Sequence, residues 1–292
     1  MSPPRVVILG GGFAGLNAAR KLERAPVEVV MVDRENYHLF QPLLYQVATA
    51  VLNPSDIAYP LRSVLRGQKN ARVVLAEAQG IDLDESVVHL DHGRLHYDYL
   101  IVATGFVDAY FGHDEWIRHA PGLKSVPEAV DIRRRILLAY EAAERARDTE
   151  AQRAWLRFVV VGGGPTGVEL AGALAEIKRQ TIEEGYRRVR QEMVEVLLIE
   201  GQERILGEFA PESSRQARRQ LEALGVKVKL GKFVTKIDET GLSLGDERID
   251  ARTVIWAAGV RASPLTASLG APVDEIGRVK AAPDLSVPGH PN

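Results

Sequence analysis

RVVILGGGFAG, residues 5–15, and FVVVGGGPTG, residues 158–167, are two copies of one local pattern. In each copy a short, mostly β-branched apolar run enters a glycine triplet. Such a run predicts a strand, the glycines predict a tight turn, and the residues after the turn predict a helix. After the first copy, Leu16–Arg24 is the expected helix, Pro26 ends it, and Val27–Val32 is the next strand. The pattern therefore predicts two βαβ units.

The second unit has a longer crossover than the first. Glu169–Arg190 is the expected helix and Val194–Ile199 the strand that follows it. Short apolar runs separated by turn residues then predict a small antiparallel meander after each unit. These runs are Arg72–Leu75, Val87–Leu90 and Arg94–Tyr97 in the first half, and Val226–Leu230, Phe233–Ile237 and Leu242–Leu244 in the second.

The predicted fold class is α/β, with two Rossmann-like dinucleotide-binding domains. Each domain is expected to hold a parallel sheet and a small antiparallel β-meander. The expected ranges are 1–112 for the first domain, 113–262 for the second, and 263–292 for a segment that returns to the first.

The first glycine set, Gly10, Gly12 and Gly15, has the spacing G-x-G-x-x-G. In this pattern the first glycine permits the turn, the second admits a pyrophosphate, and the third lets helix and strand pack closely. The phosphates meet amide N–H groups at the helix N-terminus. Asp33 ends the next strand 33 − 10 = 23 positions later, where a carboxylate can accept a hydrogen bond from a ribose hydroxyl. A dinucleotide site is predicted, and an ordinary tight turn is the alternative.

The second set, Gly162, Gly164 and Gly167, repeats the spacing, and Pro165 suits the first turn of a helix. Glu200 ends the following strand 200 − 162 = 38 positions later, and the long crossover explains this large offset. We expect Glu200 to bind a ribose and to favour NADH over NADPH, because a carboxylate repels a 2′-phosphate. A solvated residue at a strand end is the alternative. Two dinucleotide sites indicate hydride transfer between a nicotinamide and a flavin.

Composition excludes several kinds of chemistry. Cysteine is absent from the 292 residues, which excludes disulfides, thiolate metal sites and dithiol redox pairs. The formal net charge of −2 gives no overall positive field, so nucleic acid is not an expected partner. We find no secretory signal pattern, and no window approaches the roughly 20 apolar residues of a membrane span. These features predict a cytoplasmic protein without a metal site.

Longer matches carry a resemblance to a known family. Ala103-Thr104-Gly105 and Ala257-Ala258-Gly259 each follow an expected strand, 99–102 and 253–256. With the paired glycine motifs, they make the whole chain resemble the two-dinucleotide-binding flavoproteins, the pyridine nucleotide-disulfide oxidoreductase-like superfamily. NYHLFQPLLYQVA, residues 36–48, and GPTGVELAG, residues 164–172, are similar to segments of type II NADH dehydrogenases, the NADH:quinone oxidoreductases.

The resemblance implies FAD at the first glycine turn and NADH at the second. The residues that it assigns to FAD are Gly10, Gly12, Phe13, Ala14, Gly15, Asp33, Arg34, Pro42, Leu43, Ala78, Ala103, Thr104 and Gly105. Those that it assigns to NADH are Gly162, Gly164, Pro165, Thr166, Gly167, Glu200, Ala258 and Gly259.

The resemblance also assigns catalytic roles to Glu169 and Gln46. Glu169 matches a glutamate near the nicotinamide and flavin, and we expect it in the first helical turn, where the helix dipole favours its ionised form. Charge complementarity with the helix end is the alternative. Gln46 matches a residue near the quinone approach, where its amide would orient a carbonyl, and a structural loop role is the alternative. His38 is a candidate proton relay, although a lone histidine is more often structural.

The implied activity is hydride transfer from NADH to FAD and then electron transfer to a quinone, by a non-proton-pumping NADH dehydrogenase. An NADH-dependent ferredoxin- or rubredoxin-type reductase and a flavin-binding redox sensor are the alternatives. In the family, the chain continues past the position of Asn292 into a Gly-Asp pair that contacts FAD and then a membrane-binding region. We therefore expect a missing C-terminal part. For the full-length protein we expect peripheral attachment to the inner face of the cell membrane, and a homodimer is compatible with the sequence.

Overall fold

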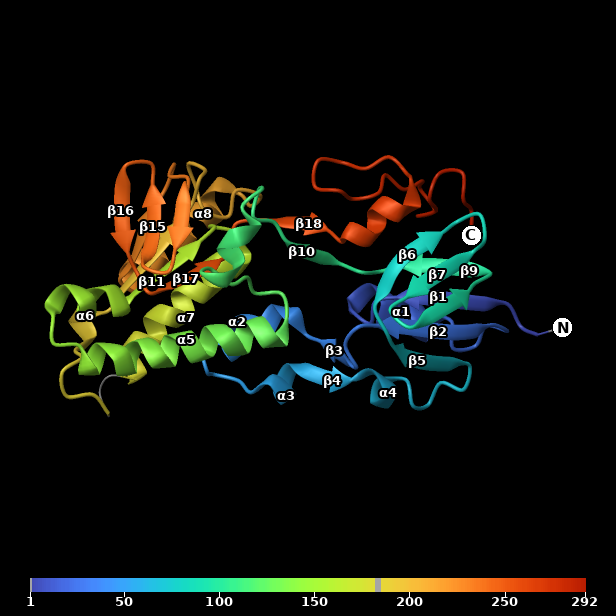
Figure 1. Ribbon diagram of the computed structural model, residues 1–292, viewed down its shortest axis with the longest axis horizontal. Helices are drawn as coiled ribbons and strands as arrows, with labels where there is room; N and C mark the ends of the chain where they lie inside the picture. The colour runs from blue at the N-terminus through green and yellow to red at the C-terminus, as the bar shows by residue number, and fades with distance from the viewer. Residues whose placement is uncertain (1, 182–184) are drawn as a thin grey trace. The chain divides into compact units, whose positions relative to one another are not determined.

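The structure is a computed structural model that describes residues 2–181 and 185–292, and it forms two compact units (Figure 1). Unit 1 comprises Met1–Phe40, Ala58–Val107 and Val260–Asn292. Unit 2 comprises Gln41–Ile57 and Asp108–Gly259. This division places the segment 41–57, which lies within the first expected domain, in unit 2.

Unit 1 is built on a four-stranded parallel sheet with the strand order β5-β2-β1-β9. Its strands are β1 (Arg5–Leu9), β2 (Glu28–Asp33), β5 (Ala71–Leu75) and β9 (Tyr99–Val102). Alternate residues of β1 enter two apolar clusters. Ile8 packs with Leu16 of helix α1 (Phe13–Lys21), whereas Val7 packs with Val88 of the meander. The sheet is therefore covered on both faces, as parallel sheets require.

The meander of unit 1 contains β6 (Ala78–Asp82), β7 (Val87–Leu90) and β8 (Gly93–His96), which pair antiparallel. Two of the three runs predicted for it are confirmed. The prediction for Arg72–Leu75 is wrong, because β5 pairs in parallel with β2 and places Val73 opposite Met31. Periodicity alone did not distinguish an edge strand of the parallel sheet from a meander strand.

The remaining elements of unit 1 are short. They are β3 (Tyr37–Leu39), β4 (Ala58–Pro60), helix α4 (Leu61–Val64), β10 (Phe106–Asp108), β18 (Val260–Ala262) and the 3-10 helix η4 (Pro264–Leu269). β3 pairs antiparallel with β4, and β10 pairs with β18. All four points where the chain passes from one unit to the other lie in or beside these two strand pairs.

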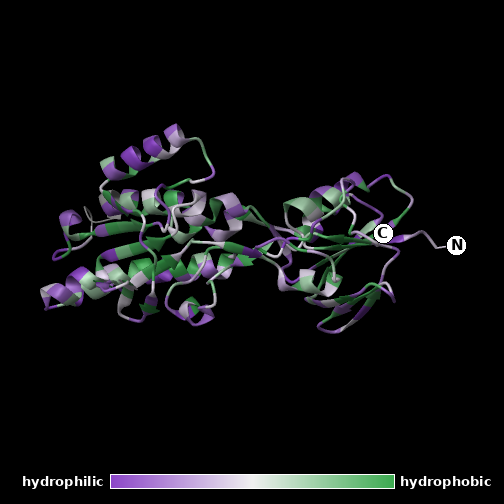
Figure 2. Ribbon diagram, turned by 90° about the horizontal axis from the view of Figure 1, so that it is seen from above, coloured by the Kyte–Doolittle hydropathy of each residue, from purple (hydrophilic) through white to green (hydrophobic). Residues whose placement is uncertain are grey.

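Unit 2 repeats the plan with the strand order β13-β12-β11-β17, all parallel. Its strands are β11 (Arg157–Val161), β12 (Glu195–Ile199), β13 (Val226–Lys229) and β17 (Thr253–Trp256). Its helices are α2 (Leu44–Ala48), α3 (Pro54–Ile57), α5 (Val126–Arg145), α6 (Thr149–Trp155), α7 (Pro165–Thr181) and α8 (Pro211–Ala223), with 3-10 turns η1 (Gln41–Leu43), η2 (Asp114–Arg118) and η3 (Gln191–Met193). In Figure 2 the apolar residues concentrate in the strands of both sheets.

Two expectations for unit 2 are wrong. The helix predicted over Glu169–Arg190 ends earlier, because 185–190 contain no helix, while 182–184 lie outside the described residues. Val226–Leu230 was predicted in the meander, but β13 pairs in parallel with β12. The antiparallel sheet instead contains β14 (Lys236–Asp238), β15 (Gly241–Leu244) and β16 (Glu247–Asp250).

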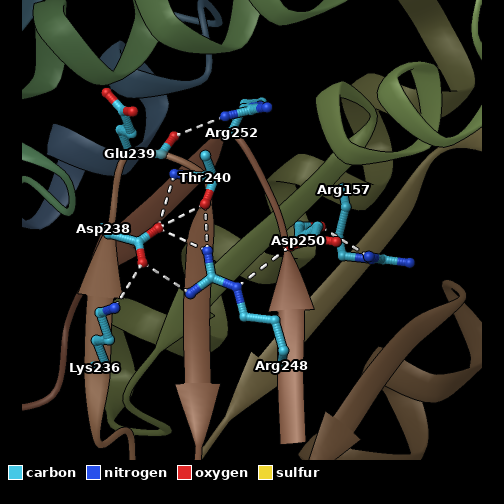
Figure 3. A network of polar contacts seen from close by, with 8 residues as sticks. All are labelled: Arg157, Lys236, Asp238, Glu239, Thr240, Arg248, Asp250 and Arg252. Atoms are coloured by element: carbon cyan, nitrogen blue, oxygen red, sulfur yellow. Dashed lines mark hydrogen bonds and ion pairs between the residues drawn. The ribbon is translucent and has the colours of Figure 1, made fainter.

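An ion-pair network joins β14, the turn that follows it, and β16 of that antiparallel sheet (Figure 3). Arg248 Nη1 and Nη2 donate to the two carboxylate oxygens of Asp238 at 3.0 and 2.6 Å. Thr240 Oγ1 donates to the same carboxylate at 2.8 Å. These bonds hold the pKa of the Asp238 carboxyl well below its usual range, chiefly through Arg248. The network stabilises a sheet whose outer face is polar.

In the described residues, no helix is both long enough and apolar enough to cross a membrane.

Candidate functional site

The glycine turn of unit 1 follows β1, and neighbouring backbone leaves no room for a side chain at its first and third glycines. Gly10 has φ +106°, and a Cβ on it would lie 2.3 Å from the carbonyl oxygen of Ala103. A Cβ on Gly15 would lie 1.8 Å from the carbonyl oxygen of Gly10. A Cβ on Gly12, by contrast, would meet no described atom within 4 Å apart from its immediate neighbours. The middle position therefore opens onto free space.

Gly11 lies inside this turn, and both its N–H and its carbonyl oxygen have a bonding partner. Its N–H donates to Asp33 Oδ2, and the second oxygen of that carboxylate accepts from Glu35 N at 2.7 Å. Its carbonyl oxygen lies 2.9 Å from His38 Nδ1. Because a carbonyl only accepts, the His38 Nδ1 carries the hydrogen of this bond. The geometry gives His38 a structural contact, which is the role that the sequence favours for a lone histidine.

An aromatic cluster lies at the start of α1. The Phe13 ring meets His38 edge-on at a centroid distance of 5.1 Å and Phe40 at 5.5 Å. Phe13 and Phe40 are each 43% exposed, so the cluster presents apolar surface next to the open side of the turn. Edge-to-face packing fixes the directions of these rings.

The other residues predicted for FAD lie around this turn or outside unit 1. Ala103 N donates to Leu9 O at 2.8 Å, which places the Ala103–Gly105 turn beside β1. Ala14 and Arg34 are exposed, Thr104 is half-buried, and Ala78 is half-buried at the start of β6. Pro42 and Leu43 lie in η1, which belongs to unit 2.

The glycine turn of unit 2 repeats this geometry. Gly162 has φ +111°, and a Cβ on it would lie 2.4 Å from the carbonyl oxygen of Ala257. A Cβ on Gly167 would lie 1.9 Å from the carbonyl oxygen of Gly162. A Cβ on Gly164 would again meet no described atom within 4 Å apart from its immediate neighbours. In each unit, the middle glycine of the motif therefore faces free space, whereas the first and third must be glycine because a side chain there would clash with backbone.

As at Gly11, both the N–H and the carbonyl oxygen of Gly163 have a bonding partner. Its N–H donates to Glu200 Oε2 at 2.6 Å, and its carbonyl oxygen accepts from Leu206 N at 2.7 Å. Glu200 Oε1 accepts from Gln202 N at 2.8 Å. Arg204 turns away from this carboxylate, because its guanidinium donates to the carbonyl oxygens of Gly207 and Phe209. Glu200 therefore fixes the turn and stays the acidic group at the end of β12.

The remaining residues predicted for NADH border the same turn. Pro165 and Thr166 open α7, and their backbone follows the open glycine. Ala258 and Gly259 are half-buried after β17. Gly259 lies beneath an exposed ring, because a Cβ on it would lie 2.6 Å from Phe111 Cζ.

Glu169 differs from its expected environment. The first turn of α7 contains no acidic residue, so Glu169 lies in the second turn. Its side chain is exposed, yet contact with the protein raises the pKa of its carboxyl through partial desolvation. The expectation that the helix dipole favours its ionised form is therefore wrong, since the dipole acts mainly on the first turn.

Gln46 lies in unit 2, on α2, and its Nε2 donates to Tyr45 Oη at 3.0 Å. α2 contacts both α5 and α7 (Figure 1). Gln46 and Glu169 therefore come from helices that pack together in one unit, although 123 positions (169 − 46) separate them in the chain.

The two turns fit dinucleotides by shape and by charge. The free space at Gly12 and Gly164 lies at the N-terminus of a helix, where amide N–H groups attract a diphosphate. In both units an acidic residue at the end of the neighbouring strand is bonded to the turn, and a carboxylate at this place is the group that could accept a hydrogen bond from a ribose hydroxyl. Among the described residues, no cluster of three or more His, Asp or Glu has the arrangement of a metal site.

Residues 4–292 match the family model of pyridine nucleotide-disulphide oxidoreductases. The type II NADH:quinone oxidoreductase Ndh of Mycobacterium tuberculosis is 43% identical over 306 residues, which cover 99% of this chain and 66% of that protein. The type II NADH:quinone oxidoreductase of Staphylococcus aureus (strain NCTC 8325 / PS 47) is 32% identical over 299 residues, which cover 99% and 72%.

A solved structure shares the fold. NDH2 from Plasmodium falciparum in complex with NADH has a TM-score of 0.85 and 22% identity, and the match covers 91% of this chain and 57% of that one. The present chain spans 66% and 64% of the lengths of two mycobacterial relatives. By sequence and by fold, the chain belongs to the pyridine nucleotide-disulphide oxidoreductase family and, within it, to the type II NADH:quinone oxidoreductases.

Proposed function

We propose that the full-length protein is an FAD-dependent NADH:quinone oxidoreductase that does not pump protons. The observation that carries this proposal is the repeated turn, in which Gly12 and Gly164 face free space while the flanking glycines are closed against backbone. A pyrophosphate needs such an opening together with helix N-terminal amides. Two such turns support two dinucleotides in one chain.

Family membership supports FAD in unit 1 and NADH in unit 2. In unit 2 the chain would hold the diphosphate of NADH at Gly164 and the adenosine ribose at Glu200. Arg204 is bound to backbone carbonyls, which favours NADH over NADPH, because the 2′-phosphate would meet a carboxylate without a free guanidinium beside it. When bound, FAD supplies a ring that accepts a hydride from NADH and delivers two electrons to the quinone.

The overall reaction needs a proton in addition to the hydride, because NADH, one proton and a quinone give NAD⁺ and a quinol. Glu169 suits proton handling, since its raised pKa brings the protonated form closer to neutral pH. Gln46 would orient a substrate carbonyl through its amide N–H groups. These two roles stay proposals, and each predicts a loss of turnover rather than of folding.

Peripheral attachment of the full-length protein to the inner face of the cell membrane accompanies this proposal, because a respiratory quinone resides in the lipid. A homodimer stays a prediction. Flotation of the full-length protein with anionic vesicles tests the attachment, and protein that remains at the bottom of the gradient contradicts it.

Steady-state NADH oxidation by the full-length protein, with a short-chain quinone or a ferredoxin as acceptor, tests the activity. We expect a yellow protein that releases FAD on denaturation and oxidises NADH with the quinone. Faster oxidation with ferredoxin would replace the proposal by the electron-carrier reductase. Oxidation no faster than with oxygen alone would replace it by the redox sensor.

Glu169→Gln tests the proton role against a matched control on the same helix. We expect Glu169→Gln to lower kcat with the quinone and to alter its pH profile, whereas Glu176→Gln, at an exposed position further along α7, leaves the profile unchanged. Equal behaviour of the two variants would remove Glu169 from the mechanism.

A further inference from the structure

The loops that follow β12 and β13 are bonded to each other through their backbones. Gly231 N donates to Gln202 O at 2.9 Å, and Lys232 N donates to Glu200 O at 3.1 Å. In unit 1 the corresponding bond joins Ala76 N to Asp33 O at 3.0 Å. The loop after β13 is therefore held beside the acidic residue of the dinucleotide turn.

Phe233 lies on this loop and rests against a glycine. A Cβ on Gly201 would lie 2.5 Å from Phe233 Cε1 and 3.0 Å from its Cζ, so the ring packs where any other residue would place a side chain. The residue is nevertheless 67% exposed. Single exposed apolar side chains are common, so exposure alone assigns no role to Phe233. Its position beside Glu200 is what points to a ligand.

The order of the strands sets the direction in which a dinucleotide would extend. The turn for the diphosphate follows β11, and the carboxylate for the ribose follows β12. The next strand outward is β13, in the order β13-β12-β11. Because adenine is bonded to the ribose on the side away from the diphosphate, it would extend toward the loop after β13. Phe233 is the exposed ring on that loop.

We propose that Phe233 is the adenine-binding residue of the dinucleotide site in unit 2, and that Gly201 is the small residue that lets its ring lie beside Glu200. This inference rests on the proposed binding of NADH in unit 2 and names the residues that hold its adenosine half. Aromatic rings stack on any base, so the ring supplies affinity for adenine, while Glu200 supplies the choice between ribose and its 2′-phosphate.

Titration of ADP-ribose into the full-length flavoprotein by calorimetry tests the proposal without any turnover. ADP-ribose contains the adenosine diphosphate half of NADH and no nicotinamide. We expect Phe233→Ala to raise its Kd about 5- to 150-fold, the range of base–aromatic stacking. Phe233→Trp keeps an aromatic face and should stay within about threefold of the wild type. Leu138→Ala, at a 48% exposed position on α5, is the matched control.

Reduced nicotinamide mononucleotide, which lacks adenosine, separates loss of stacking from distortion of the loop. We expect Phe233→Ala to raise the KM for NADH but not that for the mononucleotide. Equal increases for both substrates would overturn the proposal, as would an unchanged Kd for ADP-ribose. A wild-type protein that fails to oxidise NADH with any acceptor would refute the proposed function instead, and the ADP-ribose titration would still report on Phe233.

Gly201→Ala provides a second, independent test. The added Cβ would displace the Phe233 ring, so ADP-ribose should bind more weakly. In Gly201→Ala combined with Phe233→Ala there is no ring to displace, so the double variant should bind no more weakly than Phe233→Ala alone. Additive losses would show that the two residues act separately and would overturn the proposal.

Discussion

Asp108→Asn should stabilise the protein at neutral and alkaline pH. The Asp108 carboxyl lies against Gly122, where a Cβ would come within 2.0 Å of Oδ2. Burial raises its pKa from 3.8 to about 6, with a further contribution from Glu128 that Lys124 partly opposes. A raised acid pKa means that the folded state binds a proton more tightly than the unfolded state. The resulting stability is present below pH 3.8 and is lost as the pH rises through about 6.

The expected gain in the free energy of unfolding follows from the size of the pKa shift of Asp108. The change from 3.8 to about 6 is roughly 2 units, and each unit corresponds to about 1.36 kcal/mol, which sets an upper limit of about 3 kcal/mol. Asp108 is only half-buried, so solvent screening reduces the expected gain to about 1–2 kcal/mol. For a unit of this size, the gain corresponds to a rise of about 2–8 °C in the unfolding midpoint.

Calorimetric unfolding of wild type and Asp108→Asn at several values between pH 5 and pH 8 measures this effect. The advantage of the variant should grow with pH, because only the wild type carries an ionised carboxylate at that position. Asp246→Asn, at an exposed turn of the same unit, controls for removal of a surface carboxylate. A variant that is no more stable than the wild type at pH 8, or whose advantage does not change with pH, would refute the reasoning.

Three further predictions follow from individual contacts. Glu200→Arg removes the acceptor for Gly163 N–H and for a ribose hydroxyl, so NADH should bind about 10- to 100-fold more weakly and NADPH should be relatively favoured in a KM comparison. An unchanged ratio of the two KM values would contradict this role. Gly12→Val places a side chain in open space, so the protein should fold but lose its flavin, and retained flavin absorbance after purification would argue against the FAD site. Asp238→Asn should cost about 0.5–1 kcal/mol above pH 4, because its partly exposed pair with Arg248 is lost, and the deficit should shrink as the pH falls below 3.8, the usual pKa of the carboxyl, toward its lowered value in the folded protein. Urea unfolding at pH 7 and pH 3 checks this last prediction, and a deficit of the same size at both values would contradict it.

Local sequence patterns were sufficient to predict the elements beside the two glycine turns. The strands and turns around Gly10 and Gly162 were predictable, because a β-branched run that ends in G-x-G-x-x-G has few alternatives. β5 and β13 were assigned to meanders because an edge strand of a parallel sheet and a meander strand share the same short apolar pattern. Their true pairing depends on residues 30 or more positions away, and periodicity does not report such contacts.

Some contacts of the candidate site could likewise be predicted from the sequence, and others could not. The spacing predicted that Asp33 and Glu200 lie beside the glycine turns, and their bonds to Gly11 N and Gly163 N confirm that position, while their ribose contacts stay a prediction. The bonds from His38 to Gly11 and from Leu206 to Gly163 had no signal in the sequence. They join loops whose approach is set by packing, so no fixed spacing identifies them.

By itself, the sequence determined the two dinucleotide turns, their acidic partners and the family, because these depend on backbone steric limits and on residues close in the chain. Only the tertiary structure decided that Glu169 lies past the first turn of its helix with a raised pKa, and that Phe233 rests on Gly201 beside Glu200. Burial and ring contact are properties of neighbours in space. They exist only once β12 and β13 have paired and their loops have been brought together.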